Sequence, residues 1–142
     1  MRHQCNKHRL SKPKDQREAI LRSLATELFM HGEIKTTMSR AKALQPYAEG
    51  IISLAKKGAL NSRREALKYI YDKETGKYMD VATNEVFEEK QEGKKLTEET
   101  VLRKLFAQIG KKYETRNGGY TKIFRLTPRR GDAVDMALIQ LV

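Results

Sequence analysis

The chain has 142 residues, with 29 Lys and Arg against 18 Asp and Glu and a formal net charge of +11. This length favours one domain, and a chain of this size buries about two thirds of its unfolded surface without a disulfide framework. Cys5 is the single cysteine, and no apolar run approaches the ~20 residues that span a bilayer. These features exclude disulfide-rich scaffolds, membrane-spanning chains and collagen-like chains.

The positive charge is unevenly distributed along the chain. Residues 1–14 hold five bases and no acid, whereas residues 72–99 hold nine acids and five bases. A basic body attracts polyanions, of which nucleic acid is the commonest. A membrane surface is the weaker alternative, because the bases lie mostly in tails and loops and Trp is absent. A soluble protein without a polyanionic partner is the remaining alternative.

The N-terminal residues 1–14 are polar and basic, and they predict an extended arm. Asp15, followed by Glu18 at capping-box spacing, predicts the start of a helix. An apolar stripe at helical spacing follows, and Gly32 fits the left-handed end of that helix. Residues 33–37 are rich in β-branched side chains and predict a strand.

Two further helices are expected before the acidic stretch. Ser39 is the candidate cap of the first, whose apolar stripe ends at Gly58. Pro46 falls inside this helix, where the ring removes a backbone hydrogen bond, so we expect a kink or a restart there. Residues 62–65 have capping-box spacing and predict another helix.

The second half of the chain predicts a hairpin, a helix and two strands. Residues 77–81 and 85–89 suit an exposed hairpin that points away from a polyanion. Thr97 is the candidate cap of a helix that ends at Gly110. The last two strands are expected to be antiparallel neighbours, and they cover residues 120–126 and 134–142.

This order of elements predicts the α+β class. We expect a small three-stranded mixed sheet packed against about four helices, with the basic arm extended from the domain. The arm is expected to cover residues 1–14 and the domain residues 15–142, with an acidic insertion at about 72–99.

Three clusters of residues are candidates for nucleic-acid binding. The arm can neutralise successive phosphates, although a solvated tail is the alternative; its bases are Arg2, Lys7, Arg9, Lys12 and Lys14. In residues 116–120, adjacent glycines allow close backbone approach to a phosphate and Tyr120 can stack on a base, whereas a plain turn is the alternative. The third cluster is Arg125, Arg129 and Arg130 in a hairpin loop, where Asp132 can orient an arginine or simply cap the turn, and a loop without a nucleic-acid role is the alternative.

Catalytic and metal motifs are not found in the sequence. His3, Cys5 and His8 supply three donors among cations, whereas structural zinc normally takes four ligands, so these are expected to be simple arm residues. The sequence has no Walker loop, dinucleotide fingerprint or H-E-x-x-H motif. We therefore expect no enzyme activity, no cofactor, no metal and no small-molecule substrate.

Several ordered stretches of the chain resemble a known family, that of bacterial-type large-subunit ribosomal protein seventeen. The stretches are the opening MRH and residues 15–44, 54–67, 116–126 and 129–142. The sequences of these stretches are most similar to those of cyanobacterial and plastid members. Three features depart from the family pattern: the insertion at about 72–99, Pro46, and Gln4-Cys5-Asn6 in place of a denser basic run.

The resemblance implies a structural, non-enzymatic protein of the large ribosomal subunit, with an α+β fold. It implies binding to large-subunit ribosomal RNA near the outlet of the nascent-chain tunnel, beside large-subunit proteins twenty-two and thirty-two. The ribosome would be that of a bacterial cytoplasm or a plastid stroma. The rivals are an rRNA-processing or modifying enzyme, an assembly factor, and a DNA-compacting module.

The resemblance also assigns residues to the RNA face. Carried over position by position, these are Arg2, His3, Arg9, Lys35, Thr36, Thr37, Arg40, Lys42, Arg63, Arg64, Arg116, Gly118, Gly119, Tyr120, Arg125, Arg129 and Arg130.

Overall fold

The computed structural model describes residues 8–81, 83–90 and 96–142. Its elements, in chain order, are α1 (Lys14–His31), β1 (Glu33–Thr37), α2 (Met38–Lys57), α3 (Leu60–Ala66), β2 (Glu74–Asp80), β3 (Val86–Phe87), β4 (Leu96–Thr100), α4 (Val101–Lys104), the π-helical η1 (Leu105–Ile109), α5 (Gly110–Lys112), β5 (Thr121–Arg125) and β6 (Met136–Leu141). The helix type changes twice between Val101 and Lys112 without a break in the helix. No helix in these residues is long and apolar enough to cross a membrane.

The strands form two separate antiparallel sheets, so the predicted α+β class is confirmed. Sheet A has the order β1-β6-β5, and sheet B has the order β3-β2-β4. In sheet A, Ile34, Ile139 and Ile123 lie opposite one another across the three strands. The expected mixed pairing is wrong, because a loop joins β5 directly to β6 and β1 runs opposite to β6 on its other edge.

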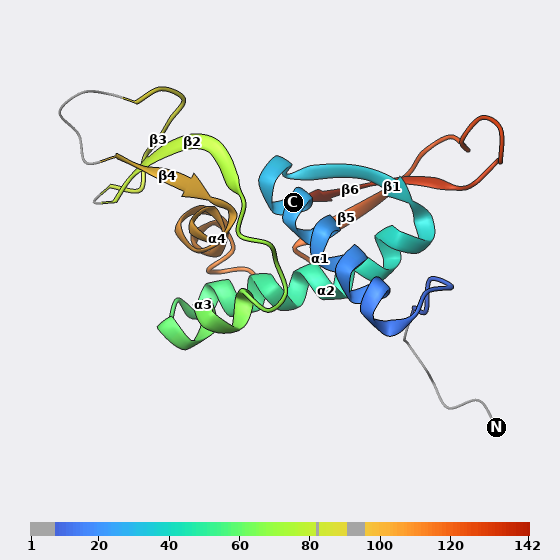
Figure 1. Cartoon of the computed structure of the whole chain (residues 1–142), viewed down its shortest axis with the longest axis horizontal. Coiled ribbons are helices and arrows are strands. Elements are labelled where there is room, and N and C mark those ends of the chain that lie inside the picture. The colour runs from blue at the N-terminus through green and yellow to red at the C-terminus, as the bar shows by residue number, and fades with distance from the viewer. Residues whose placement is uncertain (1–7, 82, 91–95) are drawn as a thin grey trace.

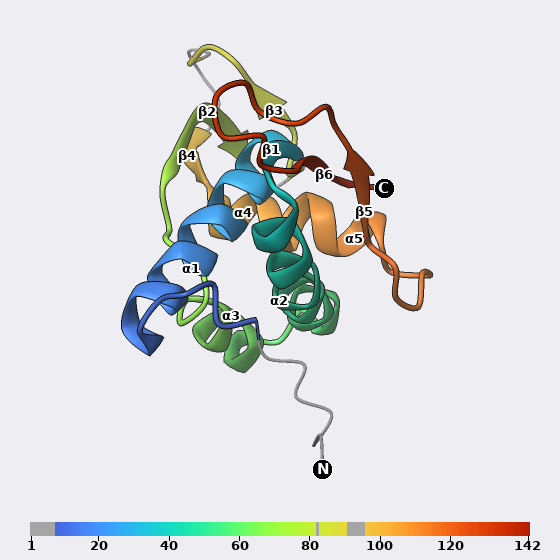
Figure 2. The same ribbon diagram turned by 90° about the vertical axis from the view of Figure 1, so that its right-hand side faces the viewer.

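The hydrophobic core lies between sheet A and the helices. Figures 1 and 2 show α1 and α2 on one side of sheet A. Leu28, Leu44, Ile52 and Ile139 are fully buried there. Each side chain of this size stabilises the fold by about 1.5–3 kcal/mol relative to an exposed position. Apolar residues at helical spacing in α1 and α2 therefore build the support for the sheet.

The ends of the first two helices are as expected, but their beginnings are not. Gly32 and Gly58 adopt positive φ of 83° and 66°, which confirms the left-handed ends. The predicted N-caps are wrong, because each helix starts earlier than its candidate cap and those side chains lie in the first turn. The residues at the N-cap positions are Pro13, Thr37 and Ala59 in place of Asp15, Ser39 and Ser62, and none makes a side-chain cap bond.

The Pro46 position does not interrupt α2. The helix runs continuously from Met38 to Lys57, so the restart that we considered does not occur. Pro46 is exposed.

The predicted cap Thr97 belongs instead to a strand. Thr97 lies in β4 opposite Met79 of β2, and Thr100 caps the helix, its hydroxyl accepting a hydrogen bond from the Arg103 amide at 3.4 Å. The local sequence did not predict β4, because its pairing with β2 joins segments that are far apart in the chain.

Gly110 does not end its helix, as the sequence suggested, but lies inside it. A Cβ atom built at Gly110 would lie 3.0 Å from the carbonyl oxygen of Ala55 in α2. The glycine therefore permits the backbones of α2 and α5 to approach closely.

The acidic insertion forms sheet B. The predicted hairpin is confirmed, since Tyr78 lies opposite Phe87 in the β2–β3 pair. The buried Glu99 carboxylate accepts hydrogen bonds from Thr75 at 2.6 Å and from Gln108 of η1 at 2.8 Å. The first bond lies within sheet B, and the second joins the sheet to the helix that follows it.

Candidate nucleic-acid interface

Three segments with exposed cations lie at one end of the molecule. Figure 1 shows the start of α1, the start of α2 and the loop between β5 and β6 at the end opposite sheet B. The Met38 amide donates a hydrogen bond to the Asp135 carbonyl at 2.9 Å, which ties the start of α2 to that loop. We define the basic end as the exposed residues Arg9, Lys12, Lys14, Lys35, Arg40, Lys42, Arg125, Arg129 and Arg130.

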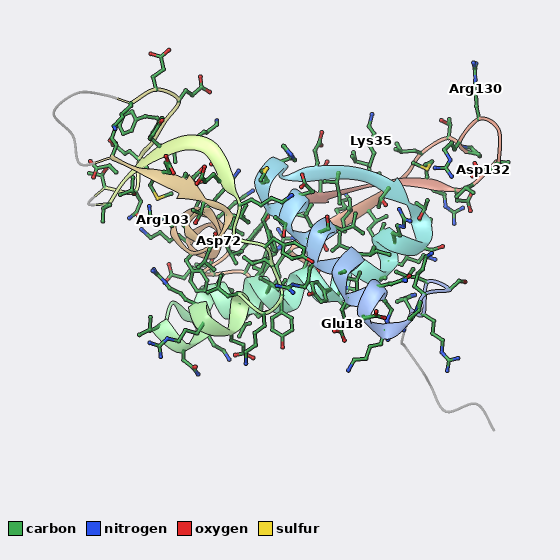
Figure 3. The ribbon with its side chains drawn as sticks, in the orientation of Figure 1. Glu18, Lys35, Asp72, Arg103, Arg130 and Asp132 are labelled. Atoms are coloured by element: carbon green, nitrogen blue, oxygen red, sulfur yellow. The ribbon has the colours of Figure 1, made fainter. Side chains whose placement is uncertain are left out.

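The loop between β5 and β6 presents its two arginines differently. Arg129 donates from Nε to Asp132 at 3.0 Å and from a second nitrogen to the other carboxylate oxygen. The hydrogen bonds from Arg129 lower the pKa of Asp132 to about 2 and hold the arginine in place. Arg130 projects into solvent in Figure 3, and among the described residues it has no ion pair. Arg130 is therefore the arginine that is free to bind a phosphate.

The two glycines at 118 and 119 form a turn that Tyr120 stabilises from inside. Tyr120 is 4% exposed, and its hydroxyl donates to the Arg116 carbonyl at 3.1 Å. The Lys56 ammonium donates to the same carbonyl at 2.7 Å and to the Tyr120 hydroxyl at 3.2 Å. Hydrogen bonding from Gly118, and then from Lys56, lowers the pKa of Tyr120.

This geometry corrects the expectation that Tyr120 stacks on a base. Its ring packs against Tyr113, with the ring centres 5.2 Å apart. Gly118 and Gly119 adopt φ of 84° and 60°, so the turn itself requires them. The side chain of Arg116 is exposed and donates from Nε to the Gly118 carbonyl at 3.4 Å.

Other predicted residues are not among the cations of the basic end. Thr36 is 6% exposed, so its side chain faces the core, and Thr37 is the residue before α2. Arg63 and Arg64 belong to α3, and the Arg63 guanidinium lies 5.2 Å from the centre of the Phe106 ring. Predicted residues outside the described part of the chain are Arg2, His3 and Lys7, together with Cys5.

Two residues that the sequence did not single out lie on the outer face of sheet A, the face away from α1 and α2. Phe124 is 39% exposed, and the Lys122 ammonium lies 5.1 Å from the centre of its ring. Alternation in β5 places both opposite the buried Thr121. That alternation was the available signal, but it identifies a solvent face only once the packed face is known.

Metal binding has no support in residues 8–81, 83–90 and 96–142. There, no three His, Cys, Asp or Glu side chains gather closely enough to hold an ion. The arrangement is instead a set of exposed cations on a rigid support, which suits binding to a polyanion.

Comparison with known families gives one match to most of the chain. A family model described as Ribosomal protein L17 matches residues 20–142. The match begins inside α1 and extends through both sheets to the last residue.

Proposed function

The chain belongs to the Ribosomal protein L17 family, and from that premise we propose that its basic end binds large-subunit ribosomal RNA near the outlet of the nascent-chain tunnel. The family is one of structural proteins of the large ribosomal subunit, which act in translation as part of a ribonucleoprotein, and it is not a family of enzymes.

The observation that carries the proposal is the gathering of exposed cations from separate segments at one end. Cations on α1, β1, α2 and the β5–β6 loop can together neutralise several phosphates of one RNA surface. Phosphate contacts position the protein, and the shape of the folded RNA supplies specificity. The opposite end carries the acidic insertion, which repels phosphates.

The resemblance leads us to propose two protein neighbours, large-subunit proteins twenty-two and thirty-two. It also favours the ribosome of a bacterial cytoplasm or a plastid stroma. Proximity crosslinking of purified large subunits, with the linked peptides identified by mass spectrometry, tests the two neighbours directly.

Sedimentation tests the proposal that the protein is a constitutive component. A tagged chain is expressed in the source organism, and the lysate is separated on a gradient at physiological salt and magnesium. We expect near-stoichiometric residence on mature large subunits that survives a moderate salt wash. Residence on immature particles alone would identify an assembly factor and contradict the proposal.

Competition separates ribosomal RNA binding from DNA compaction. The purified chain is bound to labelled large-subunit rRNA and challenged with duplex DNA of matched phosphate content. We expect duplex DNA to compete poorly, because it lacks the folded shape. Equal competition by DNA would favour the DNA-compacting alternative.

A further inference from the structure

We propose that the outer face of sheet A is a stacking platform for an unpaired RNA base, with Phe124 as its aromatic surface. The inference rests on the proposed rRNA binding and adds the kind of RNA structure that is recognised. In Figure 1, α1 and α2 lie against the inner face of the sheet, and no helix among the described residues covers the other face. The outer face is therefore open to a partner.

Strand register defines which side chains share this open face. Phe124 lies opposite Leu138, which in turn lies opposite Lys35 on the far strand. Lys122 shares the face with Phe124, because residues two apart in a strand point the same way. Figure 3 shows Lys35 projecting away from the helices. The central row therefore places an aromatic ring and a lysine about 10 Å apart, two strand spacings.

The ring at position 124 is partly exposed, and a lysine ammonium lies over it. Phe124 is 39% exposed, and the Lys122 ammonium lies 5.1 Å from the centre of the ring. Proteins that bind single-stranded nucleic acid combine such rings, on which bases stack, with cations that follow the backbone. In this arrangement a base covers Phe124, while Lys122 and Lys35 neutralise the phosphates on either side.

Charge favours RNA as the occupant over a protein. Isolated exposed apolar residues are ordinary, so the exposure of Phe124 alone carries little weight. The platform is continuous with the basic end, because Lys35 belongs to both and Arg130 projects on the same side as Lys35 in Figure 3. Glu33 is the one acid on the face within the described strands, and it lies on the strand farthest from Phe124.

The ring requires an unpaired base in the RNA. A continuous duplex keeps its base faces stacked inside the helix, and RNA-binding sheets therefore stack their aromatics on splayed bases of loops, bulges and ends. We therefore expect an internal loop or bulge of the rRNA to bind to the outer face of sheet A.

Tryptophan fluorescence tests the contact directly. The chain contains no Trp, so Phe124→Trp creates a single reporter in the full-length protein. The probes are purified large-subunit rRNA, a single-stranded oligonucleotide of about 12 nucleotides, within the roughly 4–16 nucleotides that one single-strand-binding OB fold covers, and a duplex RNA of the same length. We expect quenching by rRNA and by the single strand, and little quenching by the duplex.

Affinity for rRNA provides the second measurement. Phe124→Ala is expected to weaken binding about 5- to 150-fold, the range for loss of one base–aromatic stack, whereas Phe124→Trp retains wild-type affinity. Leu60→Ala, at an exposed apolar position of α3, is the matched control and should bind as the wild type does. Circular dichroism confirms that each variant is folded.

The outcomes separate this inference from the proposed function. If the wild type binds rRNA and Phe124→Ala binds equally tightly, the platform is wrong while the proposed function stands. If the wild type does not bind rRNA, the proposed function fails first. Equal quenching by duplex and single strand overturns the unpaired base. Quenching by RNA-free large-subunit proteins, without quenching by rRNA, shows that a protein occupies the face and also overturns the inference.

Discussion

Sheets A and B have the same number of strands and the same antiparallel pairing, yet they serve the molecule differently. One face of sheet A packs on α1 and α2, and its buried apolar residues belong to the main core. Sheet B is joined mainly at its base, where Glu99 binds Gln108, and Val81 at its far end is 64% exposed. The cations lie on the core-supported sheet and on the helix starts and loop beside it, and the appended sheet carries acids.

The two sheets therefore differ both in how firmly the core holds them and in the sign of their charge. A phosphate-binding surface needs side chains held in register, and sheet A provides this because two helices support it. If the basic end binds rRNA as proposed, we expect repulsion from the acidic sheet at the opposite end to oppose docking in the reverse direction.

The largest effect is expected on the salt dependence of rRNA binding, when cations are removed from the basic end rather than from the insertion. Replacing Lys35 and Arg130 together by Gln should reduce the slope of log affinity for rRNA against log salt by about 2, because each cation releases about one counterion. Replacing Lys77 and Lys90 by Gln removes the same charge from the insertion and should leave the slope nearly unchanged. Equal effects of the two pairs would show that net charge alone, rather than its position, controls binding.

The next largest effect is expected on the free energy of unfolding, from a substitution at the contact between α2 and α5. Gly110→Ala places a Cβ atom 3.0 Å from the Ala55 carbonyl oxygen, which is backbone and cannot rotate away. Overpacking costs about 1–3 kcal/mol and the gain in helix propensity returns about 1 kcal/mol, so we expect a net loss of about 1 kcal/mol in urea unfolding.

Gly50→Ala is the control for that substitution. Gly50 lies in α2 and a Cβ atom there meets nothing within 4 Å, so the variant should be more stable by up to about 1 kcal/mol. Stabilisation of both variants would contradict the close approach of α2 and α5.

Within the β5–β6 loop, the two arginines should differ. Arg130→Gln is expected to reduce the salt slope of rRNA binding by about 1, because its guanidinium is free to contact phosphate. Arg129→Gln should reduce it less, because Asp132 already accepts its hydrogen bonds. Filter binding over a range of salt concentrations measures both slopes, and a larger effect from Arg129 would reverse our assignment.

A smaller effect is expected on thermal stability at acid pH, where the Arg129–Asp132 pair is lost. The pKa of Asp132 is about 2 in the folded chain against an ordinary value of 3.8, chiefly through its hydrogen bonds to Arg129. A lowered carboxylate pKa stabilises the fold above pH 3.8, and the contribution is lost as pH falls through about 2. The wild type should therefore lose slightly more thermal stability between pH 4 and 2 than Asp132→Asn does. Identical pH profiles would show that the pair does not persist in solution.

Removal of sheet B should change rRNA binding least. Glu74 lies opposite Thr100, and the Val101 amide donates to the Lys73 carbonyl at 2.9 Å, so a short glycine linker can join Lys73 to Thr100. The deletion removes eight acids and four bases, and we expect equal or slightly tighter binding. A marked loss of affinity in a folded variant would show that the insertion contacts RNA.

The sequence predicted those parts of the fold whose signals are local. The helical stripes, the helix ends at Gly32 and Gly58 and the β2–β3 hairpin depend on neighbouring residues, and the sequence predicted them correctly. The strand β4 was not, because it exists only through its pairing with β2. Gly110 was misread for a similar reason, since its function lies in a contact with Ala55, far away in the sequence.

In the candidate site, too, local signals were predicted and features that depend on distant contacts were not. Charge and resemblance to a family identified the basic segments, but neither predicts which side chains face the core. Tyr120 is held inside by Lys56 and Tyr113, and Thr36 lies on the packed face of β1. Phe124 was overlooked because its exposure depends on which face of sheet A the helices cover.

The central claim is that the basic end, rather than the insertion, faces the RNA. Ultraviolet crosslinking of intact large subunits, followed by mass spectrometry of the RNA-linked peptides of this chain, tests it most directly. Our account predicts crosslinks within residues 33–42 and 122–132. Crosslinks confined to residues 74–90 and 96–100, with none at the basic end, would contradict it.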